Sequence, residues 1–171
     1  MAQRIVKMIF GDRKLPEGLS DAEMDKYFSS NFPQWITEFE EGGFLDATKV
    51  PSIEGEDDLL TKLRDTKDGM FIIKYWKRGC IPCLATSEMY KEAEGRARSE
   101  GKNISFYSVN IKDEGCKELV ENQLVEGTPT FQAFCNNKQL GDEIKEMNMA
   151  SFWSKVEERF AQCKAERTSS R

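Results

Sequence analysis

The chain has 171 residues, of which 39% are hydrophobic and 32% are charged, and its formal net charge is −5. This balance is typical of one soluble folded domain with an appendage and excludes disorder throughout. The acidic charge and the lack of a basic block argue against a nucleic-acid partner. The longest apolar run has four residues, which predicts that nothing spans a membrane.

The start of the chain has no long apolar segment and no small-residue cleavage site, so we expect no secretory signal. The expected location is the cytoplasm, or an organelle matrix if a transit peptide has been removed.

Residues 1–46 predict a small α+β extension of strand, helix and strand that docks on the rest of the chain. The apolar and β-branched residues of 4–10 predict the first strand. A capping box that begins at Ser20 predicts a helix, and Pro33 is expected to stop it. Residues 35–39 predict the second strand. We expect this extension to offer a surface to an assembly partner.

Residues 47–166 predict one α/β domain with a mixed central sheet and helices on both faces, a three-layer arrangement. The predicted strands are 48–50, 70–76, 104–109, 130–135 and 139–145, and the predicted helices are 57–66, 81–100, 113–124 and 150–166. Strand 70–76 is apolar on both faces, as expected of a central strand that helices cover. Right-handed crossovers make the first three strands parallel, and a hairpin at Asn136-Asn137 adds the last two. Residues 167–171 are expected to fray.

Two cysteines, Cys80 and Cys83, lie at the junction between strand 70–76 and the helix that follows. A thiol at a helix start is favoured as a thiolate by the unpaired amides and the helix dipole. Cys80 would then be the attacking thiol and Cys83 the resolving thiol. The residues alone also allow two inert thiols or half of a zinc site. Zinc is disfavoured, because the chain has no histidine and no second CxxC.

The order of elements, with Cys80-Ile81-Pro82-Cys83 after the central strand, resembles the thioredoxin family over about residues 48–165. Trp76 stands four residues before Cys80, as in that family. Thr128-Pro129-Thr130 resembles the family segment whose proline is cis; an ordinary trans proline that opens an edge strand is the alternative.

This resemblance implies a thioredoxin-like fold and a thiol–disulfide oxidoreductase that acts on protein disulfides. It implies no cofactor and no metal, and it implies a thiol reductant or reductase as a partner. The residues that it implies for substrate binding, beside catalytic Cys80 and Cys83, are Trp76, Gly79, Ile81, Pro82, Thr128 and Pro129.

Two residues depart from the family pattern. Lys74 stands where the family usually has a buried aspartate, and it could stabilise a Cys83 thiolate, lose its own proton, or extend to solvent. Gly79 stands where the family has a tryptophan, and it leaves a gap for the extension or a partner. An alternative function is therefore a divergent binding or structural subunit with little redox activity.

The other three cysteines, Cys116, Cys135 and Cys163, fall on apolar strands or on the buried sides of helices. We expect all three to be buried free thiols.

Overall fold

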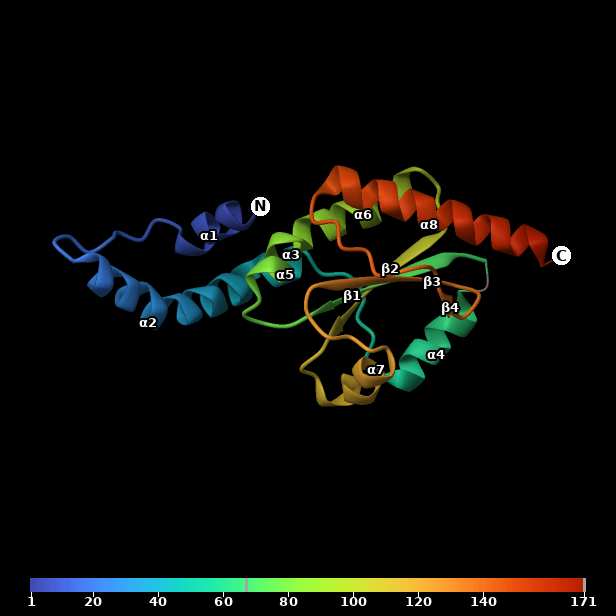
Figure 1. Ribbon diagram of the computed structural model, residues 1–171, viewed down its shortest axis with the longest axis horizontal. Helices are drawn as coiled ribbons and strands as arrows, with labels where there is room; N and C mark the ends of the chain where they lie inside the picture. The colour runs from blue at the N-terminus through green and yellow to red at the C-terminus, as the bar shows by residue number, and fades with distance from the viewer. Residues whose placement is uncertain (67, 171) are drawn as a thin grey trace.

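Four strands form one sheet in the order β2-β1-β3-β4 within residues 1–66 and 68–170, which the computed structural model describes (Figure 1). The central strand β1 (Met70–Trp76) runs parallel to β2 (Ile104–Asn110) and antiparallel to β3 (Thr130–Cys135). The short strand β4 (Lys138–Gln139) pairs with β3. The predicted mixed sheet is confirmed.

Helices cover both faces of this sheet (Figure 1). Helices α6 (Ser87–Ser99) and α8 (Met149–Ser169) lie on one face, and α4 (Glu56–Asp65) and α7 (Lys117–Asn122) lie on the other. The side chains of β1 alternate between the two cores: Met70 and Ile72 enter the first, and Phe71, Ile73 and Tyr75 enter the second. This double burial explains the continuous apolar run of β1 and confirms the three-layer α/β fold.

Of the predicted strands, one is not formed and one is shorter than expected. The predicted strand 48–50 is not formed, and the chain instead makes a single parallel bridge between Ser52 and Ser108 on the outer side of β2. The predicted strand 139–145 is reduced to β4 and one bridge between Phe131 and Ile144. Apolar residues at both places are buried, so burial alone does not require a full ladder.

Two predicted helices are broken. The predicted helix 81–100 consists of α5 (Ile81–Ala85) and α6, because Thr86 interrupts it with its hydroxyl bonded to the Pro82 and Cys83 carbonyls. The predicted helix 113–124 begins as the 3₁₀ turn η2 (Glu114–Cys116) and continues as α7.

The extension is helical, so both predicted strands in it are wrong. Residues 4–10 lie in α1 (Ala2–Phe10), and residues 35–39 lie in α2 (Asp21–Phe39). The buried side chains of α1, Ile5 and Ile9, are four residues apart, which is the spacing of one helix face. Their packing partners are helices, so this spacing outweighs the β propensity of the segment.

Helix α2 begins with the predicted capping box, in which the Glu23 carboxylate accepts from the Ser20 amide at 2.8 Å. It does not stop at Pro33, and that prediction is wrong. The proline removes one helical hydrogen bond, while packing of Trp35 and Ile36 beyond it is retained. The helix continues into a π-helical turn, η1 (Glu40–Phe44), and then α3 (Leu45–Ala47).

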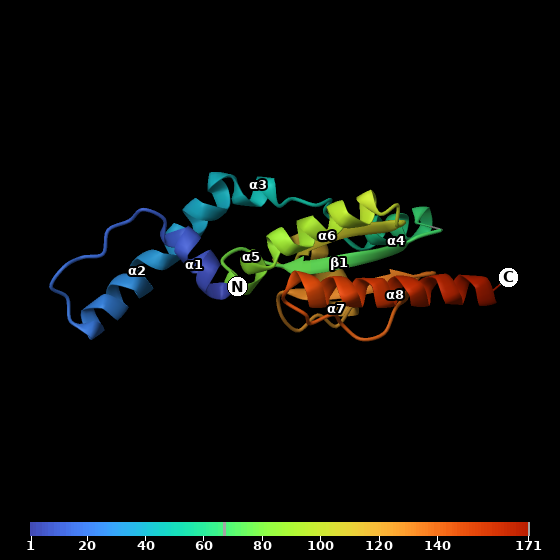
Figure 2. The same ribbon diagram turned by 90° about the horizontal axis from the view of Figure 1, so that it is seen from above.

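An aromatic cluster holds the extension together. Four rings, from Phe10, Tyr27, Phe28 and Phe32, surround Trp35 with centroid distances of 5.6 to 6.2 Å. Ile5 and Ile9 join this cluster to Leu84 of α5, and Figure 2 shows α1 beside α5. The extension therefore has a core of its own that ends on the helix of the paired cysteines.

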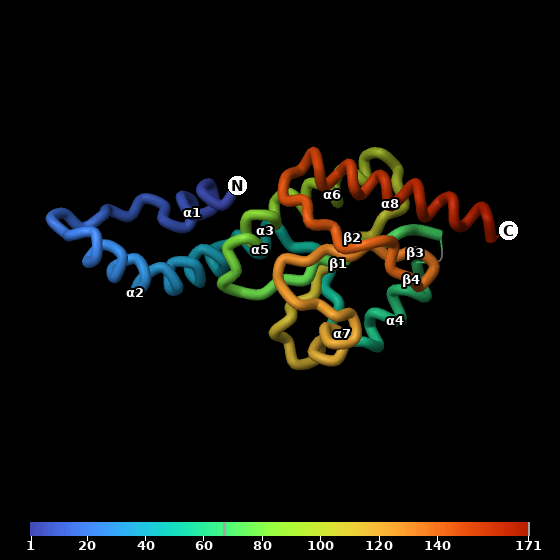
Figure 3. The backbone as a smooth tube through the Cα atoms, in the orientation of Figure 1, coloured from blue at the N-terminus to red at the C-terminus, as the bar shows by residue number. Residues whose placement is uncertain are grey.

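Helix α8 is fastened to the sheet by a disulfide between Cys135 of β3 and Cys163, with Cα atoms 5.7 Å apart. Both residues are buried as predicted, but they are not free thiols. Figure 3 shows the helix end far from the extension. The helix continues to Ser169, so the tail predicted to fray is helical for most of its length; Arg171 lies outside the described residues.

Within the part of the chain that the structure describes, no helix combines the length and apolarity that crossing a membrane requires.

Candidate functional site

The paired cysteines lie where β1 gives way to α5. Cys80 is the N-cap residue of α5, and Pro82 lies in the first turn, where its missing amide costs no hydrogen bond. The two cysteines form a disulfide with Cα atoms 5.2 Å apart. The Cys83 amide points at the Cys80 sulfur at 3.3 Å. A thiolate on Cys80 would accept that hydrogen bond and face the positive end of the helix.

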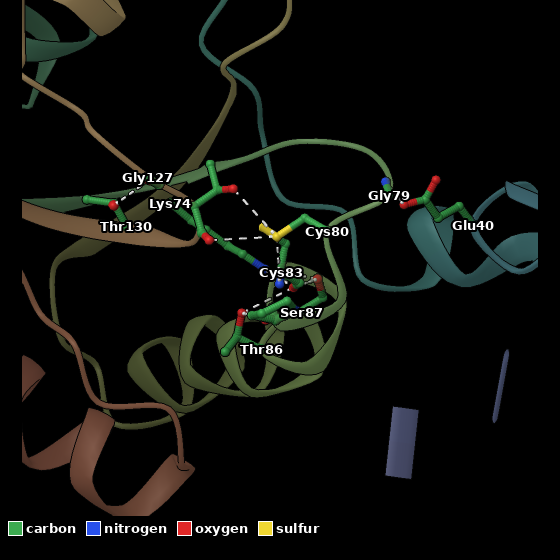
Figure 4. The surroundings of a disulfide bond; sticks show 11 residues. Glu40, Lys74, Gly79, Cys80, Cys83, Thr86, Ser87, Gly127 and Thr130 are labelled. Carbon is green, nitrogen blue, oxygen red and sulfur yellow. Dashed lines mark hydrogen bonds between the residues drawn. A yellow bond between two sulfur atoms is a disulfide. The ribbon is translucent and has the colours of Figure 1, made fainter. Parts of the chain in front are cut away.

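The segment before β3 lies beside the same sulfur. The Thr128–Pro129 peptide bond is cis, as the resemblance predicted. The Thr128 hydroxyl and carbonyl oxygens lie 3.5 and 3.7 Å from the Cys80 sulfur. Figure 4 shows this segment, marked by Gly127 and Thr130, on one side of the disulfide and Glu40 on the other.

Lys74 is buried behind the pair, with 4% of its surface exposed. Its amine donates to the Cys83 carbonyl and to the Ser87 hydroxyl, both at 2.9 Å (Figure 4). Burial lowers the pKa of Lys74 to about 7, because the charged form loses its hydration. Of the three expectations for Lys74, extension to solvent is excluded.

The carbonyl oxygen of Cys83 accepts hydrogen bonds from three side chains. It accepts from Lys74, from the Thr86 hydroxyl at 3.1 Å and from the Ser87 hydroxyl at 2.8 Å. These three side-chain bonds fix the backbone of the resolving cysteine at the break between α5 and α6.

The extension reaches the site at Gly79. The Glu40 carboxylate accepts from the Gly79 amide at 2.8 Å, and Glu40 is only 2% exposed. Next to this contact, Glu41 and Arg78 form an exposed ion pair at 3.3 Å. Gly79 has a φ of +73°, a conformation that favours glycine, and the space where a side chain would begin is open. The extension thus binds the backbone of Gly79 without filling the space beside it.

The remaining predicted site residues are spread around the pair. Trp76 ends β1 and lines a pocket near Lys74. Ile81 is half-buried against the aromatic cluster of the extension, so it faces α1 more than an incoming substrate. Pro82 is exposed, and Pro129 is half-buried beside Thr128.

Three features of the site were not predicted from the sequence. Glu40 had no signal, because the predicted helix was expected to stop at Pro33. Ser87 was predicted to lie inside one long helix, and nothing in the sequence indicated that its hydroxyl contacts the buried Lys74. The pairing of Cys135 with Cys163 requires the packing of α8 on β3, which spacing alone does not give.

The remaining cysteine, Cys116, is a buried free thiol, as predicted. Burial, with the nearby Asp113, Glu54 and Asp58 carboxylates, raises its pKa, which makes it a poor nucleophile. Among residues 1–66 and 68–170, no three His, Cys, Asp or Glu side chains are grouped as a metal site.

Comparisons with known proteins agree on one family. A family model described as Thioredoxin matches residues 55–158. A thioredoxin from Geodia cydonium is 26% identical over 94 residues, which cover 55% of this chain and 83% of that protein.

Solved structures agree in fold. Malassezia sympodialis thioredoxin has a TM-score of 0.53 at 16% identity, covering 65% of this chain and 90% of its own. Fasciola hepatica thioredoxin has a TM-score of 0.51 at 18% identity, covering 66% and 97%. A chain from a complex of ferredoxin:thioredoxin reductase with thioredoxin f2 has a TM-score of 0.54 at 16% identity, covering 64% and 94%.

Proposed function

Because the chain belongs to the thioredoxin family and carries a cysteine pair at a helix start, we propose that it reduces disulfides of other proteins through Cys80 and Cys83. The main support for this proposal is the pair of hydrogen-bond donors beside the Cys80 sulfur. The Cys83 amide and the Thr128 hydroxyl both point at it, and both would stabilise a thiolate.

The reaction has two exchange steps. The Cys80 thiolate attacks one sulfur of a substrate disulfide, forming a mixed disulfide and releasing the other substrate sulfur as a thiolate. Cys83, deprotonated, then attacks the Cys80 sulfur and releases the second substrate sulfur. The substrate has gained two electrons, and the Cys80–Cys83 disulfide remains in this chain.

A partner must return those electrons. We propose a dithiol reductase or a small thiol reductant, which opens the Cys80–Cys83 disulfide by the same exchange. One similar solved structure is a thioredoxin f2 in complex with ferredoxin:thioredoxin reductase, which supports a reductase as the natural donor. Neither exchange step calls for a bound cofactor.

Substrates would approach from the Thr128 side. We expect the backbone of Thr128 to pair with an extended segment of the substrate, as in strand addition. On the other side, Glu40 already occupies the Gly79 amide, and α1 covers part of α5. Our candidates for substrate contacts remain Trp76, Gly79, Ile81, Pro82, Thr128 and Pro129. Of these, we expect Thr128 and Pro129 to contribute most.

Lys74 would handle the proton of the resolving thiol. Its pKa of about 7 lies near the pH at which a group can both accept and donate a proton. The Lys74 amine, hydrogen-bonded to the Cys83 carbonyl, would then take over the proton transfer for which the family uses a buried aspartate.

An insulin-reduction assay with excess dithiothreitol tests the function directly. Wild type should accelerate insulin precipitation over the dithiothreitol blank, and Cys80→Ser should not. Incubated with insulin in the absence of dithiothreitol, reduced Cys83→Ser should accumulate a mixed disulfide on Cys80 that added reductant releases. Fully reduced wild type that gives only the blank rate would contradict the proposal.

A second function, a binding subunit with little redox activity, is favoured by the extension bound to the Gly79 amide. A pulldown separates the two. Partners that stay bound in stoichiometric amount to both Cys80→Ser and Cys83→Ser support the binding subunit, and partners captured only by Cys83→Ser support the oxidoreductase.

The proposed reaction also bears on the cellular compartment in which the protein acts. The exchange cycle needs a supply of thiols, so we propose the cytoplasm or an organelle matrix. Rapid alkylation of cell extracts checks this: Cys80 and Cys83 should be recovered mainly as reduced thiols. Recovery of that pair fully oxidised would point to an oxidising compartment.

A further inference from the structure

A pocket of about 410 Å³ has Lys74 in its lining, and neither Cys80 nor Cys83 is among its lining residues. Its walls come from the segment that links α3 to α4, from the ends of β1 and β2 and from the start of α6. Hydroxyl and amide groups are frequent in the wall, on Ser52, Ser87, Ser108, Tyr90 and Asn110. The pocket is large enough for a small organic molecule.

Lys74 is the buried amine of this pocket. The charged side chains that line it with Lys74, namely Asp46, Lys49, Arg78 and Asp113, are all exposed residues. Within the described residues, no carboxylate oxygen lies within 4.0 Å of the Lys74 amine, and burial alone accounts for its lowered pKa. An ammonium here is thus desolvated and lacks a close counter-charge.

The contacts of the amine are two hydrogen-bond acceptors and the ring of Tyr90, whose centroid lies 5.9 Å from the nitrogen. A neutral amine has two N–H donors, and two acceptors are present at 2.9 Å, the Cys83 carbonyl and the Ser87 hydroxyl. With both protons used in this way, the remaining position on the nitrogen is a lone pair. Desolvated lysines of this kind act as nucleophiles toward carbonyl compounds in other proteins.

We propose that Lys74 is a nucleophilic amine and that its pocket takes small carbonyl compounds, which it binds as Schiff bases. The nitrogen forms a bond to the carbonyl carbon, giving a carbinolamine. The carbinolamine oxygen then leaves as water with both amine protons, and a C=N bond remains. No electron is gained or lost. When the imine nitrogen takes up a proton from solvent it gains one N–H, for which the Cys83 carbonyl is a nearby acceptor.

This inference uses neither sulfur, but it shares the Lys74 amine with the proton transfer proposed above, so a Schiff base on Lys74 would block that transfer. It predicts an unusual order of reactivity, in which a buried lysine reacts before exposed ones. Each unit of pKa changes the neutral fraction of an amine by a factor of about ten. At pH 6.5 the neutral fraction of Lys74 exceeds that of an ordinary surface lysine by much more than that.

The test is reductive labelling of the full chain with propanal and cyanoborohydride at pH 6.5, read by peptide mass spectrometry. Lys74 should be labelled at least about tenfold faster than exposed Lys7 and Lys138, a margin that leaves room for slower access to the pocket. In urea, the rates at Lys74 and Lys138 should become equal. Labelling of Lys74 in the folded chain at or below the Lys138 rate would overturn the proposal.

Ser52→Phe separates pocket access from a general property of the lysine. Ser52 is an exposed residue of the pocket wall and contacts neither cysteine. Phenylalanine there should slow the labelling of Lys74 severalfold and leave Lys138 unchanged. If Lys74 is labelled equally fast in this variant, the carbonyl compound does not reach it through the pocket, and the assigned site is wrong.

Discussion

The carboxylate of Glu40 accepts a hydrogen bond from the amide of Gly79 at 2.8 Å. Glu40 follows directly on the last residue of α2, and Gly79 directly precedes Cys80. This contact thus joins the extension to the backbone one residue before the proposed nucleophile.

Glu40→Ala should destabilise the protein by about 1–3 kcal/mol, because it leaves the Gly79 amide without its acceptor. Urea unfolding measures this loss. Insulin reduction by the same variant should change as well, because the loop before Cys80 is released. Glu41→Ala is the matched control: its ion pair with Arg78 is exposed, so its effect should be under about 1 kcal/mol. Equal effects of the two variants would show that the buried contact is unimportant.

Lys74 should make stability depend on pH between about 7 and 9. Its pKa is about 7 in the folded protein and near 10.5 when unfolded, so in this window the unfolded chain holds one more proton. The free energy of unfolding therefore rises with pH, and the penalty for burying Lys74 is fully present below pH 7. Above pH 10 the buried Tyr75 and Tyr90, whose pKa values burial raises, would act in the opposite direction.

The measurement is urea unfolding of wild type and Lys74→Met at pH 7 and pH 9. Wild type should gain a few kcal/mol over this interval, since each unit is worth about 1.4 kcal/mol, and the variant should gain much less. Identical pH profiles would mean that Lys74 keeps an ordinary pKa in the folded state.

Ile9→Ala should loosen the extension before the rest of the domain. Ile9 is 1% exposed between α2 and α5, and truncating a buried isoleucine costs about 2–5 kcal/mol. Hydrogen exchange should speed up in α1 and α2 and change little in β1. The control is Val6→Ala on the exposed side of α1, with an effect within about 0.5 kcal/mol. Equal acceleration in β1 would instead mean that extension and domain unfold together.

Cys163→Ala should cost about 2–4 kcal/mol, because the bond to Cys135 closes a loop of 28 residues' separation. Non-reducing urea unfolding measures it, and dithiothreitol should shrink the difference from wild type. Cys116→Ala, which removes a buried sulfur but no bond, should cost clearly less. Insulin reduction should be unaffected in both variants, and a loss of turnover in Cys163→Ala alone would tie the second disulfide to the proposed reaction.

The sequence predicted the sheet and its covering helices because β1 is apolar on both faces and the other elements of the domain follow one another with clear breaks. The Cys80–Cys83 pair was visible at the strand-to-helix junction, and the resemblance to the thioredoxin family placed Thr128 and Pro129 beside it. Sequence-based prediction failed in the extension, where Ile5 and Ile9 satisfy both a strand and a helix pattern. The tertiary partners of these two residues on α2 and α5, such as Trp35 and Leu84, favour the helix.

The course of α2 through Pro33 was unpredictable for a related reason. A proline in a helix has a local cost that is visible in the sequence, and the compensating burial of Trp35 is not. The contact between Glu40 and Gly79 depends on that continuation, and so the sequence could not reveal it either.

Helix α2 has 19 residues and is therefore a rod of about 28 Å. One end stands away from the domain (Figure 1), and the other end is joined through Glu40 to the amide of Gly79, the residue before Cys80. If the helix tilts as a rigid body, the backbone bonded to its other end, at Gly79, is displaced with it. We therefore expect a change in the tilt of α2 to shift the backbone of Gly79, the residue that precedes Cys80.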